Sequence, residues 1–121
     1  MELWECNKEF IDNRELIEKV MVKATLEAGA EIREVTFHAF TPQGISGTII
    51  ISESHLAIHT FPEHGYASLD VFTCGDRIDP QVVAEIIAQK LGSKKVYTLN
   101  MERGLGEILL TGEYQSKERL A

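Results

Sequence analysis

Apolar residues return every three or four positions in two stretches of this chain, a spacing that predicts two amphipathic helices. The first spans about residues 13–28, with a capping start at Asp12 and a stop at Gly29. The second begins at Asp79, as N-cap, and Pro80, as the first helical residue. The predicted core-facing stripes are Leu16, Ile17, Val20, Met21, Ala24 and Ala28 in the first helix and Val82, Val83, Ile86, Ile87 and Leu91 in the second.

Alternating apolar and polar residues predict β-strands in the rest of the chain. The expected strands cover residues 1–5, 34–40, 46–51, 56–61, 66–73, 95–99 and 108–110, with turns at 52–55 and 62–65. This order predicts an α/β (α+β) fold, a two-layer sandwich with a mostly antiparallel sheet and two helices on one face. The other sheet face would carry Thr36, His38 and Phe40, so we expect a partner layer there. The polar tail from Glu113 is expected to be mobile.

Composition and charge narrow the range of functions. The chain has 121 residues, so a single domain over residues 1–121 is expected. A formal net charge of −7 without a Lys/Arg cluster argues against nucleic acid and membrane surfaces as partners. Two cysteines, Cys6 and Cys74, do not make a disulfide framework, and no apolar signal or spanning segment is visible. We therefore expect a cytoplasmic protein.

The candidate chemistry gathers around one predicted turn. Ser54 lies in the turn after an apolar strand, His59 follows five residues later, and Cys74 ends another strand. A hydroxyl, an imidazole and a thiol are groups used in covalent catalysis. Taken singly, each has a simpler interpretation, as a turn serine, a structural histidine and a buried apolar thiol. On one uninterrupted strand Ser54 and His59 would face opposite sides, so a turn or bulge must intervene if they meet.

Other candidates are open to two interpretations. His55 and His59 lie on a predicted strand, too far apart for one metal ion, so no metal site is expected. Phe40 and Phe61 at strand ends either pack in a core or interface, or clamp a flat ligand. Glu63 is a solvated hairpin acid or a ligand for hydroxyl groups.

Several motifs together closely resemble the small prokaryotic S-adenosylmethionine decarboxylases. The resemblance runs from about residue 3 to about residue 104 and is densest between Phe37 and Gly75. It is carried by Phe37-His38-x-Phe40, Pro42-Gln43-Gly44-x-Ser46-Gly47, Ser52-Glu53-Ser54-His55-Leu56, Ile58-His59-Thr60-Phe61-Pro62-Glu63 and Gly65-Tyr66-Ala67-x-x-Asp70-Val71-Phe72-Thr73-Cys74-Gly75.

The resemblance implies a proenzyme that cuts itself. The Ser54 hydroxyl would attack the carbonyl of Glu53, and the resulting ester would break into a β chain, residues 1–53, and an α chain, residues 54–121. Ser54 would become a covalent pyruvoyl group, the cofactor that forms a Schiff base with the substrate amine, with no metal and no pyridoxal phosphate. The family's roles in self-processing fall on Ser46 and His59, with His59 as the proton acceptor.

The resemblance also implies how the substrate is bound and used. S-adenosylmethionine would lose CO2 to give S-adenosylmethioninamine, the aminopropyl donor for spermidine. Cys74 matches the proton donor, Phe40 and Phe61 match rings that stack on adenine, and Glu63 matches an acid near the ribose. Family members form homodimers of processed αβ protomers with four αββα layers and sites built from both protomers.

Two alternatives stay open at this point. The same pyruvoyl chemistry on arginine or ornithine is one, because some members of this family use those amines. A non-catalytic, uncleaved homologue that binds or regulates a partner is the other. Family members also carry further residues, including Gly-Arg-His, before the segment that matches Leu3-Trp4-x-Cys6, so the first strand is expected to be short or missing.

Overall fold

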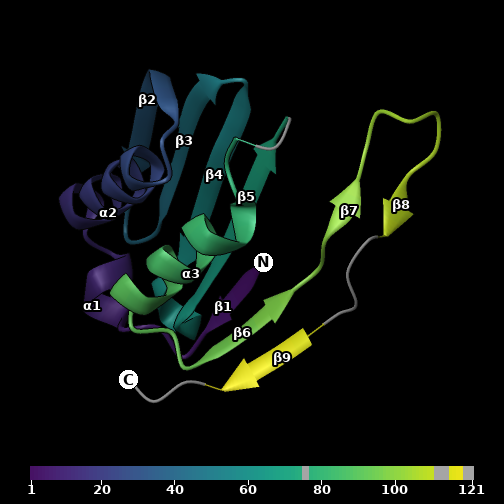
Figure 1. Cartoon of the computed structure of the whole chain (residues 1–121). Helices are drawn as coiled ribbons and strands as arrows, with labels where there is room; N and C mark the ends of the chain where they lie inside the picture. Colours follow the sequence, from purple (N-terminus) through teal and green to yellow (C-terminus); the bar gives the residue numbers. More distant parts are fainter. Residues whose placement is uncertain (75–76, 111–114, 119–121) are drawn as a thin grey trace.

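The computed structural model describes residues 1–74, 77–110 and 115–118, the last of these by its backbone (Figure 1). Gly75, in the densest part of the resemblance, and Glu113, where the polar tail begins, lie outside the described residues. The helices are α1 (Lys8–Ile11), α2 (Arg14–Glu27) and α3 (Pro80–Lys90), with a 3₁₀ turn, η1 (Pro62–His64). The strands are β1 (Glu2–Trp4), β2 (Glu31–Ala39), β3 (Ile45–Ser52), β4 (Ser54–Phe61), β5 (Tyr66–Thr73), β6 (Lys95–Thr98), β7 (Met101–Glu102), β8 (Leu109–Leu110) and β9 (Gln115–Glu118).

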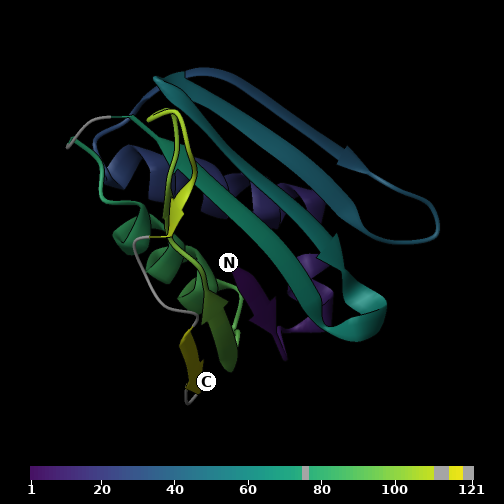
Figure 2. The same ribbon diagram turned by 90° about the vertical axis from the view of Figure 1, so that its right-hand side faces the viewer.

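The described strands form one large antiparallel sheet and one small hairpin. The large sheet has the order β2-β3-β4-β5-β1-β6-β9, and each neighbouring pair is antiparallel. Helices α2 and α3 cover one face of this sheet and leave the other bare (Figure 2). The predicted α/β two-layer sandwich is therefore confirmed.

The core lies between the helices and the sheet, where alternate strand residues meet the helical stripes. Ile17, Met21 and Ala24 of α2 and Val83 and Ile87 of α3 are buried there. They pack against apolar residues of the sheet: Leu3, Ile45, Ile49, Ile51, Leu56, Ile58, Ala67, Leu69 and Val96. The prediction for Val82 was wrong, because this residue lies on the outer side of α3 and is 50% exposed.

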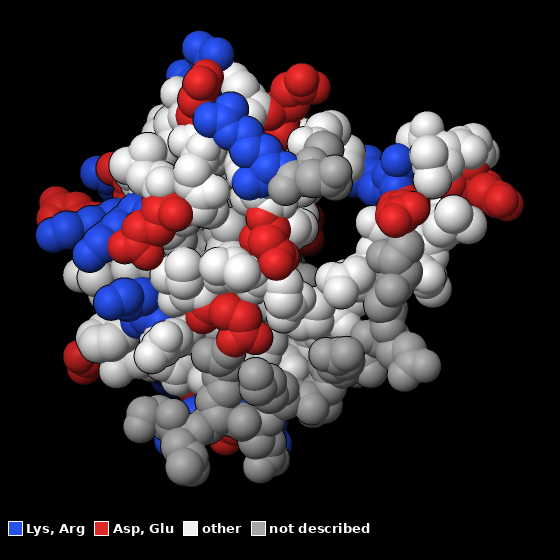
Figure 3. Space-filling view, viewed as in Figure 1, with Lys and Arg blue, Asp and Glu red and all other residues white. Residues whose placement is uncertain are grey.

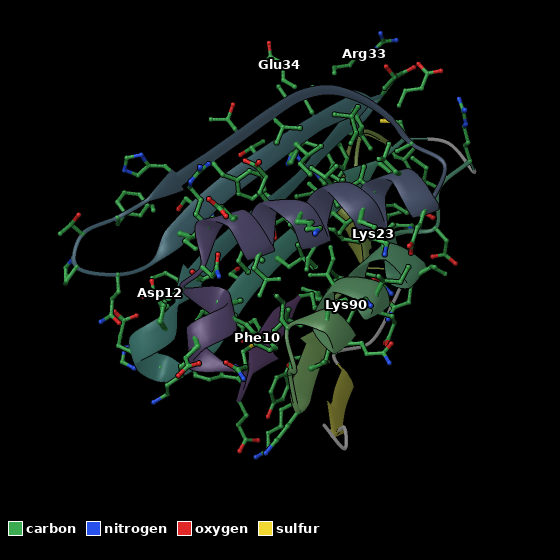
Figure 4. All side chains as sticks on the ribbon, turned by 90° about the vertical axis from the view of Figure 1, so that its left-hand side faces the viewer. Phe10, Asp12, Lys23, Arg33, Glu34 and Lys90 are labelled. Atoms are coloured by element: carbon green, nitrogen blue, oxygen red, sulfur yellow. The ribbon has the colours of Figure 1, made fainter. Side chains whose placement is uncertain are left out.

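The start of the long helix differs from the prediction. A separate four-residue helix, α1, precedes it, and Asp12 is the C-cap of α1. The N-cap of α2 is Asn13, whose side chain accepts a hydrogen bond from the Leu16 amide. The Asp12 carboxylate instead accepts a hydrogen bond from the Gly44 amide at 3.0 Å. Figure 4 shows Asp12 at the end of the helical layer that lies beside this loop. A tertiary contact thus determines the role of Asp12 in place of the local capping pattern.

The two ends of the chain both add strands to the sheet. The short first strand is present as β1 and lies between β5 and β6. It pairs with β5 at only two positions, Glu2 with Ser68 and Leu3 with Ala67. The expectation of a mobile tail was wrong for residues 115–118, because β9 pairs with β6. The strand expected over residues 108–110 is the shorter β8, which pairs with β7 in a hairpin projecting from the body of the molecule (Figure 1).

The sheet face away from the helices, called here the open face, carries a mixture of polar and aromatic residues. By strand register it includes Glu34, Thr36, His38, Ser46, Thr48, Ile50, His55, His59, Phe61, Tyr66, Ser68, Asp70 and Phe72. Figure 4 shows Glu34 pointing away from the helical layer. On the helical side, acidic and basic side chains are interspersed (Figure 3). None of the described helices is both long and apolar enough to cross a membrane.

Candidate active site

Ser54 begins β4 immediately after a very tight turn. Strand β3 ends at Ser52 and β4 begins at Ser54, so Glu53 is the one residue between them. The two strands pair up to this point, with Ile51 opposite Ser54. Ser54 has a φ of 102°, a region that costs a non-glycine residue about 1–3 kcal/mol. Pairing on both sides holds Ser54 in this strained conformation, next to the Glu53 carbonyl.

Ser54 and Cys74 meet although they are distant in sequence. Strand β5 runs beside β4 with Thr73 opposite Ser54, so Cys74 follows directly at the end of the strand. The Ser54 hydroxyl oxygen lies 3.2 Å from the Cys74 sulfur, within hydrogen-bonding distance. Cys74 is exposed, whereas the other free cysteine, Cys6, is buried. The structure thus places a hydroxyl nucleophile and an accessible thiol side by side.

Ser46 and His59 form a second pair elsewhere on the sheet. They face each other across β3 and β4, and the Ser46 hydroxyl is 2.8 Å from Nδ1 of the imidazole. Strand β4 is continuous from Ser54 to Phe61, so no bulge brings His59 back to Ser54. His59 is five positions after Ser54 along the strand, a distance of roughly 16–17 Å. The structure therefore brings the four residues together as two pairs and not as one cluster.

The two candidate stacking rings are exposed and have different neighbours. Phe40 is 51% exposed and meets His38 edge-on, with ring centroids 4.6 Å apart. Phe61 is 42% exposed and stacks on Tyr66, with centroids 5.6 Å apart and an interplanar angle of 22°. Exposed rings of this size are more consistent with a ligand or a protein partner than with the core. Glu63 lies in η1 directly after Phe61 and is also exposed.

Two polar contacts hold the loop that carries Phe40 against the rest of the protein. Gly44 donates its amide proton to Asp12, and its carbonyl accepts from the Phe40 amide at 2.8 Å. A Cβ at Gly44, which has a φ of +101°, would come within 3.2 Å of the Thr60 carbonyl oxygen. The Thr60 hydroxyl donates to the Ile11 carbonyl at 2.7 Å and accepts from the Ile45 amide at 2.9 Å. Thr60 is buried, so these bonds connect α1 to the strands beneath the loop.

A cavity of about 520 Å³ opens beside the Ser54 end of the sheet. Its lining includes His55, which follows Ser54, and Phe72, which precedes Cys74 by two residues. The Arg103 guanidinium covers the Phe72 ring at 4.3 Å from the centroid. Among the described residues, no three His, Cys, Asp or Glu side chains are grouped so as to hold a metal ion.

Sequence reasoning missed the contacts that support these candidates. The partners of Asp12 and Thr60 come from other elements, so the capping pattern at Asp12 and the motif that contains Thr60 did not reveal them. Tyr66 and Trp4, which pack together next to Phe61, were not singled out. The available signals were that both residues are aromatic and that both lie in segments where apolar and polar residues alternate. The pairing of β1 with β5, however, is not visible in the sequence.

Comparison with known proteins identifies the family. The family model described as S-adenosylmethionine decarboxylase matches residues 1–104. An S-adenosylmethionine decarboxylase proenzyme of Bacillus cytotoxicus is 54% identical over 118 residues, which is 98% of this chain and 86% of that protein. One from Shouchella clausii is 58% identical over 107 residues, 88% and 83% of the two chains. The crystal structure of the adenosylmethionine decarboxylase from Aquifex aeolicus superimposes with a TM-score of 0.73 at 29% identity, covering 98% of this chain and 84% of that one. With a family model matched over most of its length and relatives above half identity, this chain belongs to the S-adenosylmethionine decarboxylase family.

Proposed function

We propose that this chain is the proenzyme of an S-adenosylmethionine decarboxylase that activates itself at the Glu53–Ser54 bond. The proposal depends on one observation in a chain of this family: Ser54 is held in a strained backbone conformation with its hydroxyl next to the Cys74 thiol. Its relatives of 54–58% identity are named as proenzymes, and the chain spans more than four fifths of their length. The activity is therefore proposed for the whole chain.

The processing step uses the geometry of the turn. The Ser54 oxygen attacks the Glu53 carbonyl carbon, and the bond between that carbon and the Ser54 nitrogen breaks, so the amide becomes an ester. Loss of the Ser54 α-proton then expels the Glu53 carboxylate. Water hydrolyses the resulting enamine, releases ammonia and leaves a ketone at residue 54. The strained φ of Ser54 favours the first step because the strain is relieved as this amide breaks.

The residues present fit a pyruvoyl group at position 54. Such a group supplies an electron-withdrawing ketone that binds the substrate amine covalently while CO2 leaves. The Cys74 thiol, 3.2 Å from the Ser54 oxygen, is placed to return a proton to the substrate carbon. Its exposure leaves room for a substrate between the thiol and solvent.

We further propose that a complete site requires two copies of the chain. Within one chain, the Ser46–His59 pair is too far along β4 to act on Ser54. A two-fold axis that brings the open faces of two copies together would place the partner subunit's His59 near the end of β4 at which Ser54 lies. His59 would then take the Ser54 α-proton during processing, held in position by Ser46. The same contact would cover the open face and give four layers, αββα.

The substrate's nucleoside is expected at the exposed rings. Phe40 and Phe61 are available for stacking on adenine, and Glu63 is close enough in sequence to Phe61 to accept bonds from ribose hydroxyls. Ornithine has no flat group to stack on these rings, and the planar guanidinium of arginine offers a smaller surface than a purine. The exposed pair of phenylalanines therefore favours the nucleoside substrate over arginine or ornithine.

Two measurements test the proposal. Intact-mass analysis of purified protein is expected to show fragments 1–53 and 54–121, the second without a free amino group. Release of labelled CO2 is then measured with S-adenosylmethionine, arginine and ornithine in parallel, and turnover is expected with the first. A stable full-length chain would contradict the processing step, and turnover of a basic amino acid alone would contradict the substrate.

A further inference from the structure

Three aromatic rings form a row across three neighbouring strands of the open face. Phe61 of β4 is directly opposite Tyr66 of β5 in the strand register. Because Leu3 of β1 pairs with Ala67, Trp4 is the next residue in line beside Tyr66. The ring centroids are 5.6 Å apart for Phe61 and Tyr66 and 4.4 Å apart for Tyr66 and Trp4. This set is called the aromatic row.

The middle ring of the aromatic row is fixed at both ends. The Tyr66 hydroxyl donates a hydrogen bond to the Glu2 carboxylate at 3.1 Å. Burial raises the pKa of Tyr66 and outweighs an opposing effect of Ser68, and the neighbouring carboxylate of Glu2 raises this pKa further, so the phenol stays protonated and donates at neutral pH. At its base, Gly65, in the left-handed conformation, accepts a hydrogen bond from the Cys6 amide at 2.9 Å. The N-terminal segment thus fastens the hairpin that joins Phe61 to Tyr66.

The two candidate stacking rings differ in their support. The plane of Phe61 is inclined by 22° to that of Tyr66, which in turn lies at 30° to Trp4. Phe40, by contrast, meets His38 at 72° and has no stacked neighbour among its described ring contacts. A ring backed by a second ring loses less conformational freedom when a ligand binds, because its rotamer is already restricted. Phe61 is therefore the preorganised surface, and Phe40 is the adaptable one.

We propose that Tyr66, backed by Trp4 and anchored to Glu2, is a positioning residue that sets the plane of Phe61 for the purine of the substrate. The proposal rests on the proposed function and adds to it a determinant of nucleoside affinity that does not touch the reacting atoms. Tyr66 acts on binding of the base and not on the chemistry at residue 54. Its removal should therefore affect KM and nucleoside affinity while leaving cleavage and kcat nearly unchanged.

The experiment compares three variants in the processed protein. Tyr66→Leu removes the middle ring, Tyr66→Phe keeps it without the bond to Glu2, and Phe10→Leu removes an exposed ring on α1 as the matched control (Figure 4). Each is checked for cleavage by intact mass, then assayed for KM and kcat with S-adenosylmethionine. Binding of 5′-methylthioadenosine, a nucleoside without the amino-acid part, is measured by calorimetry, with methionine as the probe without a base.

Tyr66→Leu is expected to raise KM and the nucleoside Kd about 2- to 10-fold, the range for loss of one aromatic contact. Tyr66→Phe should recover most of the affinity, and Phe10→Leu should match the wild type. Trp4 is the only tryptophan, so the tryptophan fluorescence of the protein comes from the aromatic row alone. Binding of the nucleoside at Phe61 should change this fluorescence through Tyr66. This response to the nucleoside should be lost in Tyr66→Leu even at saturation.

Different results would overturn different statements. If the wild type turns over S-adenosylmethionine and Tyr66→Leu keeps its KM and Kd, the positioning role is wrong and the proposed function stands. An equal loss in Phe10→Leu would also contradict the positioning role, since the effect would then not be specific to the row. If the cleaved wild type neither turns over S-adenosylmethionine nor binds the nucleoside, the proposed function fails, and this inference with it.

Discussion

The Ser54 hydroxyl and the Cys74 thiol lie 3.2 Å apart, although twenty positions separate them in the sequence. Their meeting depends on the register between β4 and β5, which places Thr73 opposite Ser54. A shift in that register would move the end of β5, and Cys74 with it, along β4 and away from Ser54. The hairpin through η1 therefore has a direct effect on the candidate active site, although it lies at the opposite end of both strands.

Replacing Ser54 with alanine should abolish cleavage and activity together, because no other hydroxyl adjoins the Glu53 carbonyl in the same way. Ser52→Ala is the matched control, since Ser52 is two residues away and its hydroxyl contacts Arg33. Intact mass is expected to show one chain of 13.6 kDa for Ser54→Ala and two fragments for the control. Decarboxylation by Ser54→Ala protein would rule out the pyruvoyl mechanism.

Replacing Cys74 with alanine should separate the two reactions. Cleavage starts at the Ser54 oxygen and should continue at least in part, whereas turnover should fall about 10²- to 10⁴-fold with the loss of a general acid. Fragment ratios and CO2 release from the same preparation measure both effects. Complete failure to cleave with normal folding would instead assign Cys74 to the processing step.

A composite site predicts that two inactive variants can complement each other. Ser54→Ala and His59→Ala are each expected to be inactive alone. In a mixed dimer, one of the two sites receives Ser54 from the His59→Ala protomer and His59 from the Ser54→Ala protomer, so both groups are intact there. Random pairing during co-expression should therefore restore about a quarter of the sites.

The control for this experiment is a mixture of the two variants after separate purification, in which processing has already failed. Cleaved protein is quantified by mass and activity by CO2 release. Absence of any recovery from co-expressed, dimeric protein would place the whole site within one chain.

Thr60→Val should lower the free energy of unfolding by about 1–3 kcal/mol, because the Ile45 amide and the Ile11 carbonyl lose a buried partner. Valine has nearly the same shape, so packing is largely preserved. Thr48→Val, on the exposed side of β3, is the matched control and should change stability little. Urea denaturation measures both; the processing-deficient Ser54→Ala background keeps the chain in one piece.

Stability should fall at alkaline pH through Cys6. Burial raises the pKa of this thiol from 9.0 to about 11 in the folded protein. The neutral thiol is thus favoured by folding: its contribution is fully present below pH 9 and is lost as the pH rises through about 11. Urea midpoints from pH 8 to 11, under reducing conditions, should decline less steeply in Cys6→Ala than in wild type. Equal slopes would contradict the buried-thiol explanation.

The sequence predicted most of the sheet because its strands have clear period-two alternation. The alternation also predicted correctly which of residues 34–40 share a face of the sheet. From Val35 to Ala39 the strand pairs one to one with β3, without a bulge that would reverse the alternation. Helix α1 was missed because four residues are too few to show a helical period. The roles of Asp12 and Thr60 depend on contacts 32 and 49 residues away, which no local pattern reveals.

Part of the candidate site was recognisable from local motifs, but its geometry was not. Ser54, His59 and Cys74 were found by residue type and resemblance. The structure adds that Ser54 belongs with Cys74 and His59 with Ser46. Whether a turn would unite Ser54 and His59 depended on the length of β4, and β4 begins two residues earlier than alternation alone suggested.

Cleavage at the single residue between β3 and β4 would affect how the protein refolds. A break after Glu53 would leave the two pieces interleaved, since β3 stays paired with β4 and β1 stays between β5 and β6. The nicked protein should therefore hold together without a covalent link. Once unfolded, however, its halves must find each other by diffusion, so recovery would depend on protein concentration. Maturation would in this way turn a chain that refolds unaided into an assembly that is difficult to rebuild when dilute.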